Sequence, residues 1–170
     1  MRHIISFLLL AAMGSFIGAV RDGDVTAVRQ MLARGADPNA PDGVNDWTPL
    51  LHAIHKNQLR SVQALLDGRA DPNRAVNGET PLMMAAGYGY TPIVKLLIAR
   101  GASPGVRNAE GETAVDYAVT GVTDIDRFTF FRCDDDTVRA LVAANAPRTI
   151  KPSSRRWGWI KRCDSLALLR

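Results

Sequence analysis

A repeated motif at fixed spacing constrains this chain more than any other feature. Thr48-Pro49-Leu50 and Thr80-Pro81-Leu82 lie 32 residues apart, and Thr113-Ala114-Val115 follows 33 residues after Thr80. Short turns that contain Ala and Pro recur in phase with these openers, at residues 36–39, 70–73 and 102–105. A fixed period of about 20 to 50 residues indicates stacked repeats, each of which buries its apolar face only against its neighbours.

The most regular unit, residues 80–101, predicts what each repeat folds into. Gly89 separates two helical stripes of apolar residues, which are Leu82, Ala85 and Ala86, then Val94, Leu97 and Ile98. Pro92 suits the first turn of a second helix, and Gly101 stands where a helix end needs a left-handed residue. Each unit is therefore predicted to be a helix, a turn, a helix and an extended loop, which makes the fold all-α.

These motifs resemble the ankyrin repeat, whose signature is Thr-Pro-Leu-His-x-Ala on a period of about 33 residues. The resemblance covers residues 15–147. It implies an ankyrin-repeat solenoid of about four helix-turn-helix repeats, with an elaborated C-terminal cap. It also implies a non-catalytic protein–protein interaction module that binds a partner protein on its concave face, which loop tips and inner helices build. We expect a monomer with no cofactor.

Position in the repeat frame assigns the residues that are expected to face that partner. They are Arg21, Asp22, Val44, Asn45, Trp47, His55, Lys56, Val76, Asn77, Glu79, Tyr88, Ala109, Glu110 and Glu112. Trp47 and Tyr88 are the expected anchors, because large aromatic side chains dominate the energetics of interfaces.

Two repeats depart from the motif. Arg69 replaces the glycine that stands at Gly35 and Gly101, and Gly68 comes one place early. Either backbone strain at Arg69 or a shifted helix end is expected there. In the fourth repeat an insertion of 11 residues separates the two helices, within residues 120–136.

The inserted segment and the C-terminal tail both carry aromatic residues and one cysteine each. Phe128, Phe130 and Phe131 accompany Cys133, whereas Trp157 and Trp159 precede Cys163. A disulfide between Cys133 and Cys163 would close a loop of about 30 residues and hold the tail over the last repeat. The run Asp134-Asp135-Asp136 is expected to start a helix, since it lacks the spaced ligands of a calcium loop.

The N-terminus predicts export. Arg2 is followed by residues 4–20, a run of seventeen residues without a charge, with small residues at Ala12 and Gly14. We interpret residues 1–14 as a cleaved signal peptide of a periplasmic or secreted, bacterial-type protein. An uncleaved membrane anchor, and a hydrophobic first helix of a cytoplasmic protein, stay open as alternatives.

The basic charge belongs to the tail. The chain carries a net charge of +4, but residues 149–170 hold six Lys or Arg against one Asp, so the rest is close to neutral. A basic tail with two tryptophans supports an alternative function, that of a membrane-associated protein acting through this segment. Six positive charges are too few to favour nucleic acid as a partner.

The sequence contains no catalytic constellation and no metal motif. Of the three histidines, His52 and His55 are three residues apart but have no third ligand nearby in sequence. They are expected to be exposed or to satisfy loop hydrogen bonds. Residues 87–89, Gly-Tyr-Gly, follow no strand and indicate a turn rather than a phosphate-binding loop.

Overall fold

The computed structural model describes residues 15–43, 45–121 and 134–147. These residues form eight helices, and apart from one isolated bridge between Val76 and Glu79 they contain no strand. The helices alternate between seven and nine residues in length: α2 (Phe16–Asp22), α3 (Val25–Ala33), α4 (Pro49–His55), α5 (Leu59–Asp67), α6 (Pro81–Gly87), α7 (Thr91–Ala99), α8 (Ala114–Thr120) and α9 (Asp135–Ala143). The predicted all-α class, with four helix-turn-helix repeats, is confirmed.

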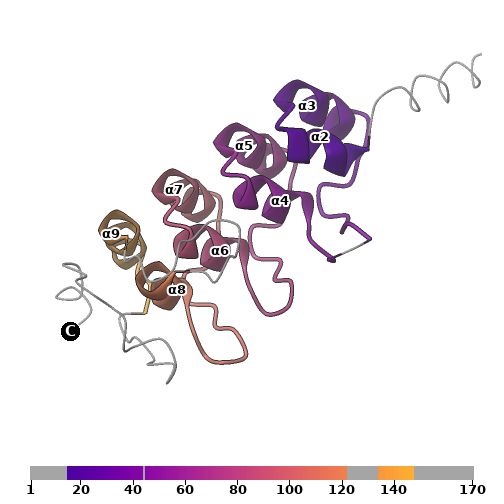
Figure 1. Ribbon diagram of the computed structural model, residues 1–170. Coiled ribbons are helices and arrows are strands. Elements are labelled where there is room, and N and C mark those ends of the chain that lie inside the picture. Colours follow the sequence, from indigo (N-terminus) through magenta and orange to yellow (C-terminus); the bar gives the residue numbers. More distant parts are fainter. Residues whose placement is uncertain (1–14, 44, 122–133, 148–170) are drawn as a thin grey trace, which may run out of the picture. The chain divides into compact units, whose positions relative to one another are not determined.

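The chain divides into two compact units, residues 1–71 and 72–170. In the first, α2 packs on α3 and α4, and α5 packs on α3 and α4 (Figure 1). The seven-residue helices form one layer and the nine-residue helices the other. Between them lies a core of buried apolar side chains: Val20, Val28, Leu50, Ile54, Val62 and Leu65.

The second unit repeats this arrangement with the last four helices. α6 packs on α7 and α8, and α9 packs on α7 and α8 (Figure 1). Its core contains Leu82, Met83, Ile93, Val94, Leu97, Val115, Val138 and Leu141, all fully buried. The packing of α9 shows that the fourth repeat keeps its second helix in spite of the insertion.

The helices begin at the residues that the motif predicts. The hydroxyl groups of Thr48 and Thr80 accept hydrogen bonds from the third backbone N–H that follows, at 3.3 and 3.2 Å. The Asp134 carboxylate accepts one from the N–H of Thr137 at 2.8 Å, which confirms that the aspartate run starts a helix. Ser15 caps α2 through the N–H of Gly18 at 2.9 Å, and α2 packs on α3 and α4 as the first helix of repeat one.

The structure distinguishes between the two expectations for Arg69, backbone strain or a shifted helix end. Arg69 has a φ of 69°, the left-handed conformation that Gly101 adopts with a φ of 90°. The backbone is therefore strained at Arg69, because a side chain disfavours this region. Gly68 has a φ of −80°, a conformation that does not require glycine. A Cβ atom there would lie 2.8 Å from Leu32 Cδ1, on α3.

Asparagine side chains join the ends of successive repeats. Asn39 Nδ2 donates to the carbonyl of Arg69 at 3.3 Å, and Asn39 Oδ1 accepts from the N–H of Asp71 at 2.8 Å. In the second unit Asn73 makes the same pair, to the carbonyl of Gly101 at 2.9 Å and the N–H of Ser103 at 2.8 Å. Each asparagine thus satisfies one acceptor and one donor that a helix end leaves open.

The third repeat has no such bridge to the fourth. The position of Asn39 and Asn73 is occupied by Gly105, which has no side chain to donate or accept. The position of the donating N–H is occupied by Pro147, which has no N–H. Instead, the carboxylate of Asp134 accepts from the Thr91 hydroxyl at 3.2 Å and joins α7 to the start of α9.

One buried hydroxyl in the first unit is expected to lower stability. Ser61 on α5 is fully buried, and its Oγ has no hydrogen-bond partner within the part of the chain that the structure describes. Ser61→Ala should therefore raise the free energy of unfolding by about 1 kcal/mol, since the unsatisfied group is removed. The shift of the urea midpoint measures this.

A matched control lies on α9. Thr137 occupies the same third position of its helix, but its hydroxyl is 2.8 Å from that of Thr91. Thr137→Val, which keeps the shape and removes this bond, should lower stability. If Ser61→Ala instead lowered the free energy of unfolding, as Thr137→Val is expected to do, the Ser61 hydroxyl would have a hydrogen-bond partner.

Several predictions lie outside the described residues. These are the signal peptide at 1–14, Val44, the phenylalanines of the insertion, the Cys133–Cys163 disulfide and the tail from 148 onward. Across the described ranges, no helix has both the length and the apolar character needed to cross a bilayer.

Candidate partner-binding surface

In the first unit the loop before α4 places Trp47 against two histidines. The Trp47 ring centroid lies 5.3 Å from that of His52, at a tilt of 59°, and 5.2 Å from that of His55, edge-on at 70°. Both histidines come from α4, where a spacing of three residues puts them on the same face. Trp47 itself is half-buried, so it keeps part of its ring accessible while the histidines fix its orientation.

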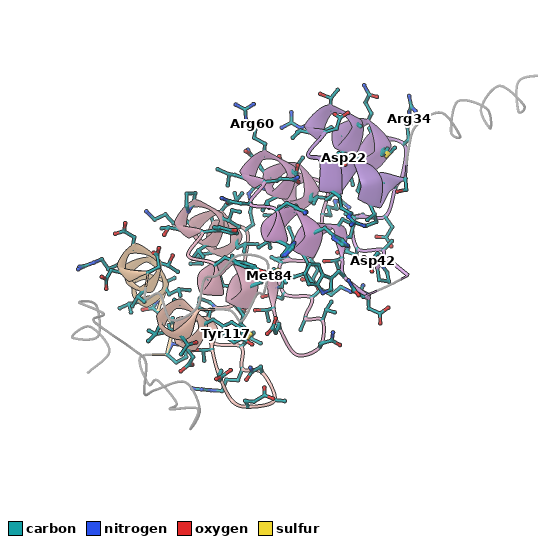
Figure 2. The ribbon with its side chains drawn as sticks, in the orientation of Figure 1. Asp22, Arg34, Asp42, Arg60, Met84 and Tyr117 are labelled. Atoms are coloured by element: carbon teal, nitrogen blue, oxygen red, sulfur yellow. The ribbon has the colours of Figure 1, made fainter. Side chains whose placement is uncertain are left out.

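Asp42 ties this loop together (Figure 2). Its N–H donates to the carbonyl of Trp47 at 2.8 Å, and one carboxylate oxygen accepts from the N–H of Asn45 at 2.8 Å. The other carboxylate oxygen lies 2.6 Å from His52 Nε2. A single residue thus fixes the base of the loop, its tip and its attachment to α4.

His52 is almost completely buried, with 7% of its surface exposed. Burial lowers the pKa of His52 below its usual value of 6.5, and the charges of Arg21 and His55 act in the same direction. The hydrogen bond and the charge of Asp42 raise the pKa but do not cancel the effect of burial. At neutral pH His52 is therefore uncharged and donates its Nε2–H to Asp42. The expectation that a histidine here satisfies a loop hydrogen bond is confirmed.

The other predicted residues of the first unit lie at the surface. Arg21 and Asp22 are exposed at the end of α2, Asn45 is exposed at the loop tip, and Lys56 is exposed just after α4. His55 is half-buried. We call Arg21, Asp22, Asn45, Trp47, His55 and Lys56 the Trp47 surface.

The second unit has a polar network at the start of α8. The Tyr117 hydroxyl donates to Glu79 at 2.7 Å and accepts from Asn108 Nδ2 at 3.3 Å. Asn108 also donates to the Glu112 carboxylate at 3.1 Å and accepts from the Glu112 N–H at 2.8 Å. The network links the loops before α6 and α8.

The network corrects one predicted binding residue. Glu112 is only 5% exposed and faces Asn108, so its side chain is not available to a partner. The repeat frame placed it correctly near a loop tip, but the loop turns it inward to make this bond. Burial raises the pKa of the Tyr117 hydroxyl, and the hydrogen bond to Glu79 adds to this. Tyr117 therefore stays a proton donor across the physiological range.

The remaining predicted residues of the second unit are accessible. Asn77, Ala109 and Glu110 are exposed at the loop tips, whereas Val76 and Glu79 are half-buried at the base of a hairpin. Tyr88 is also half-buried, and its ring stacks on that of Tyr90 at 5.2 Å with an interplanar angle of 17°.

The family model for ankyrin repeats (3 copies) matches residues 16–108 and again residues 62–149. The chain belongs to the ankyrin-repeat family. Ankyrin repeats generally mediate protein–protein interaction, and the family is typically non-catalytic.

Curated relatives include proteins of several kinds. The chain is 38% identical over 101 residues to the B-cell lymphoma 3 protein homolog of Mus musculus, a match that covers 59% of this chain and 22% of that protein. It is 44% identical over 72 residues to the 2-5A-dependent ribonuclease of Mus musculus, covering 42% and 10%. For zygote-specific protein 3 of Chlamydomonas reinhardtii the identity is 34% over 99 residues, covering 58% and 26%. The matches thus span about a quarter or less of these relatives.

The described residues of this ankyrin-repeat chain present aromatic, charged and amide side chains at their loops. Among them no group of three His, Cys, Asp or Glu side chains could hold a metal ion. The first unit offers the oriented indole of Trp47 beside charged side chains of both signs. The second unit offers exposed amide and carboxylate groups.

Sequence reasoning did not find three residues that shape these surfaces. Asp42 lies 10 residues from His52, and Tyr117 lies 38 residues from Glu79. For Asp42 one signal was present. The sequence has His at residue 52, one place after the histidine position of the repeat motif. The His52 ring therefore needs a hydrogen-bond partner that differs from the usual one of the motif, and the loop before α4 supplies Asp42. For Asn108 and Tyr117 the motif contains no comparable signal.

Proposed function

We propose that this ankyrin-repeat protein binds a partner protein through the face that carries its loop tips and first helices, the concave face in our sequence analysis. In the first unit this face is the Trp47 surface. In the second unit it consists of accessible residues from the loops and the end of α6: Val76, Asn77, Glu79, Tyr88, Ala109 and Glu110.

The packing of Trp47 is the observation that carries the proposal. Its ring is held by His52 and His55, while Asp42 closes the loop around its backbone carbonyl. A side chain that is already ordered loses little conformational entropy on binding, so more of its contact energy contributes to affinity. Tryptophan is also among the residues that most often dominate an interface.

The test begins with capture at the loop tip. A photo-crosslinking amino acid in place of exposed Asn45 labels the partner protein in a cell-envelope extract. The partner identified in this way is then purified, and its affinity for the unmodified chain is measured by titration. Trp47→Ala should weaken this binding by about 30- to 100-fold, the loss of at least 2 kcal/mol that is typical of an aromatic anchor.

Arg60→Ala is the matched control. Arg60 is exposed on α5 of the same unit and takes no part in the Trp47 surface (Figure 2). Its removal should leave the affinity within about twofold, since surface substitutions away from an interface change little. Equal affinities for Trp47→Ala and the unmodified chain would refute the assignment of the anchor.

The basic tail supports a second candidate function, contact with an anionic membrane. It rests on the charge of residues 149–170 and on Trp157 and Trp159, which lie outside the described residues. Attraction between exposed charges is screened by salt, whereas burial of an indole is not. Binding to anionic vesicles that disappears between 0.05 and about 0.5 M salt would favour the tail. Partner binding that survives the same change favours the Trp47 surface.

We also infer that the protein acts outside the cytoplasm. The support is the charge-free run behind Arg2, which predicts a secretory signal. This is why the envelope is the extract chosen for capture. A partner recovered from the cytosolic fraction alone would contradict export while leaving the binding surface intact.

A further inference from the structure

The loop that presents Trp47 depends on one buried contact. Asp42 reaches the loop tip through Asn45 and the loop base through Trp47, but its link to the helix layer is its bond to His52, at 2.6 Å. The Trp47 ring in turn rests on the His52 ring. Asp42 and His52 thus both contribute to the position and orientation of Trp47, together with the edge-on contact of His55.

We propose that Asp42 and His52 are positioning residues that hold Trp47 in place for its partner, and that they release it when His52 becomes protonated. This inference rests on the proposed function in one respect, that Trp47 is the anchor. It adds the two residues that orient the anchor and a condition under which binding is lost.

The surroundings of His52 oppose a positive charge. Burial removes water from the ring, and the charged or titratable groups that bear on it from other positions are Arg21 on α2 and His55 on α4. Asp42, in the loop, and the indole of Trp47 favour the protonated form, but the effect of burial is larger and lowers the pKa of His52. Protonation is therefore easier when the loop is open and the ring is in water.

The direction of the pH effect follows from this difference. A histidine with a lower pKa in the closed loop binds fewer protons there than in the open loop, whose pKa is about 6.5. Closure is fully favoured above pH 6.5 and becomes weaker as the pH falls from there toward the lowered value. The closed loop should therefore lose stability on mild acidification.

Amide hydrogen exchange on the full chain measures the loop directly, without the partner. The N–H groups of Asp42 and Asn45 are both hydrogen-bonded in the closed loop. After correction for intrinsic exchange, their protection should fall several-fold between pH 7.5 and 5.5. The hairpin amides of Val76 and Glu79 are bonded to each other's carbonyls at 3.0 Å in the second unit, whose sequence contains no histidine, and they should keep their protection.

Two variants separate positioning from general stability. His52→Gln keeps a side-chain N–H for Asp42 but cannot be protonated, so the loop should stay protected at both pH values. His52→Ala should lose protection at both, while Val76 and Glu79 report that the second unit is still folded. Arg60→Gln, at an exposed position of α5 outside the Trp47 surface, should retain the pH dependence of the unmodified chain.

Two results would overturn the inference. One is a His52→Gln loop that still loses protection on acidification, because the proton would then act elsewhere. The other is unchanged protection of Asp42 and Asn45 in His52→Ala. Neither result bears on whether Trp47→Ala weakens partner capture, so the inference and the proposed function fail separately.

Discussion

Leu97→Ala is expected to lower the free energy of unfolding by about 2–5 kcal/mol. Leu97 lies on α7, which packs on α6 and α9, and its side chain is fully buried with 0% exposed. The substitution removes apolar area from the core and leaves a cavity that the surrounding helices fill only in part. Urea unfolding followed by the helical circular dichroism signal measures the change.

The neighbouring residue supplies the control. Leu96 is on the same helix but is partly exposed, so Leu96→Ala removes the same atoms with less lost burial. It should destabilise the protein clearly less than Leu97→Ala. If both substitutions shifted the midpoint equally, the buried stripe of Val94, Leu97 and Ile98 assigned to α7 would be wrong.

Asp116→Ala is expected to cost about 2–4 kcal/mol, because it leaves buried donors without an acceptor. Asp116 on α8 is 1% exposed, and one of its carboxylate oxygens accepts from the N–H of Thr113 at 2.7 Å and from the Thr113 hydroxyl at 2.8 Å. Bonds to an ionised acceptor are stronger than bonds between neutral groups, and water cannot replace them at this depth. The same urea titration measures the loss.

Two further variants test whether the carboxylate acts through these bonds. Asp116→Asn keeps an oxygen acceptor and should cost less than Asp116→Ala. Asp136 is an exposed carboxylate in the first turn of α9, and Asp136→Ala should change stability by only about 0.5 kcal/mol. A loss for Asp136→Ala as large as that for Asp116→Ala would mean that helix charge, not hydrogen bonding at Thr113, stabilises the repeat.

Local and periodic features of the fold were predictable from the sequence. The Thr-Pro-Leu openers located α4 and α6, and the stripe in residues 91–99 identified Leu97 as buried. Such features depend on a few consecutive residues and on a period that every repeat shares. At Arg69 the sequence left two possibilities, because a strained residue and a displaced helix end produce the same misalignment. Leu32 lies close to the place that a Cβ atom of residue 68 would occupy, a proximity that no local pattern encodes.

The candidate surfaces were predictable only in outline. The repeat frame places Trp47 and Glu112 near loop tips, and both lie there. Whether a side chain near a loop tip is exposed depends on which neighbouring side chains it contacts. Trp47 meets two histidines and stays partly accessible, whereas Glu112 meets Asn108 and is buried. Contacts of this kind arise from the shape of one loop, which varies in length between repeats.

The asparagine bridges determine which repeats could be duplicated without loss of the hydrogen bonds between neighbours. A duplicated segment that ended like repeat two would bring its own copy of Asn73, and the copied turn would bring the carbonyl and N–H that Asn39 binds in the original. Duplication there extends the pattern without a compensating mutation. A duplicate of repeat three would end at a copy of Gly105, and one of repeat four would place Pro147 where a donor is needed. A copy of repeat two would therefore preserve both hydrogen bonds of the bridge, whereas a copy of repeat three or four would lose one of its partners.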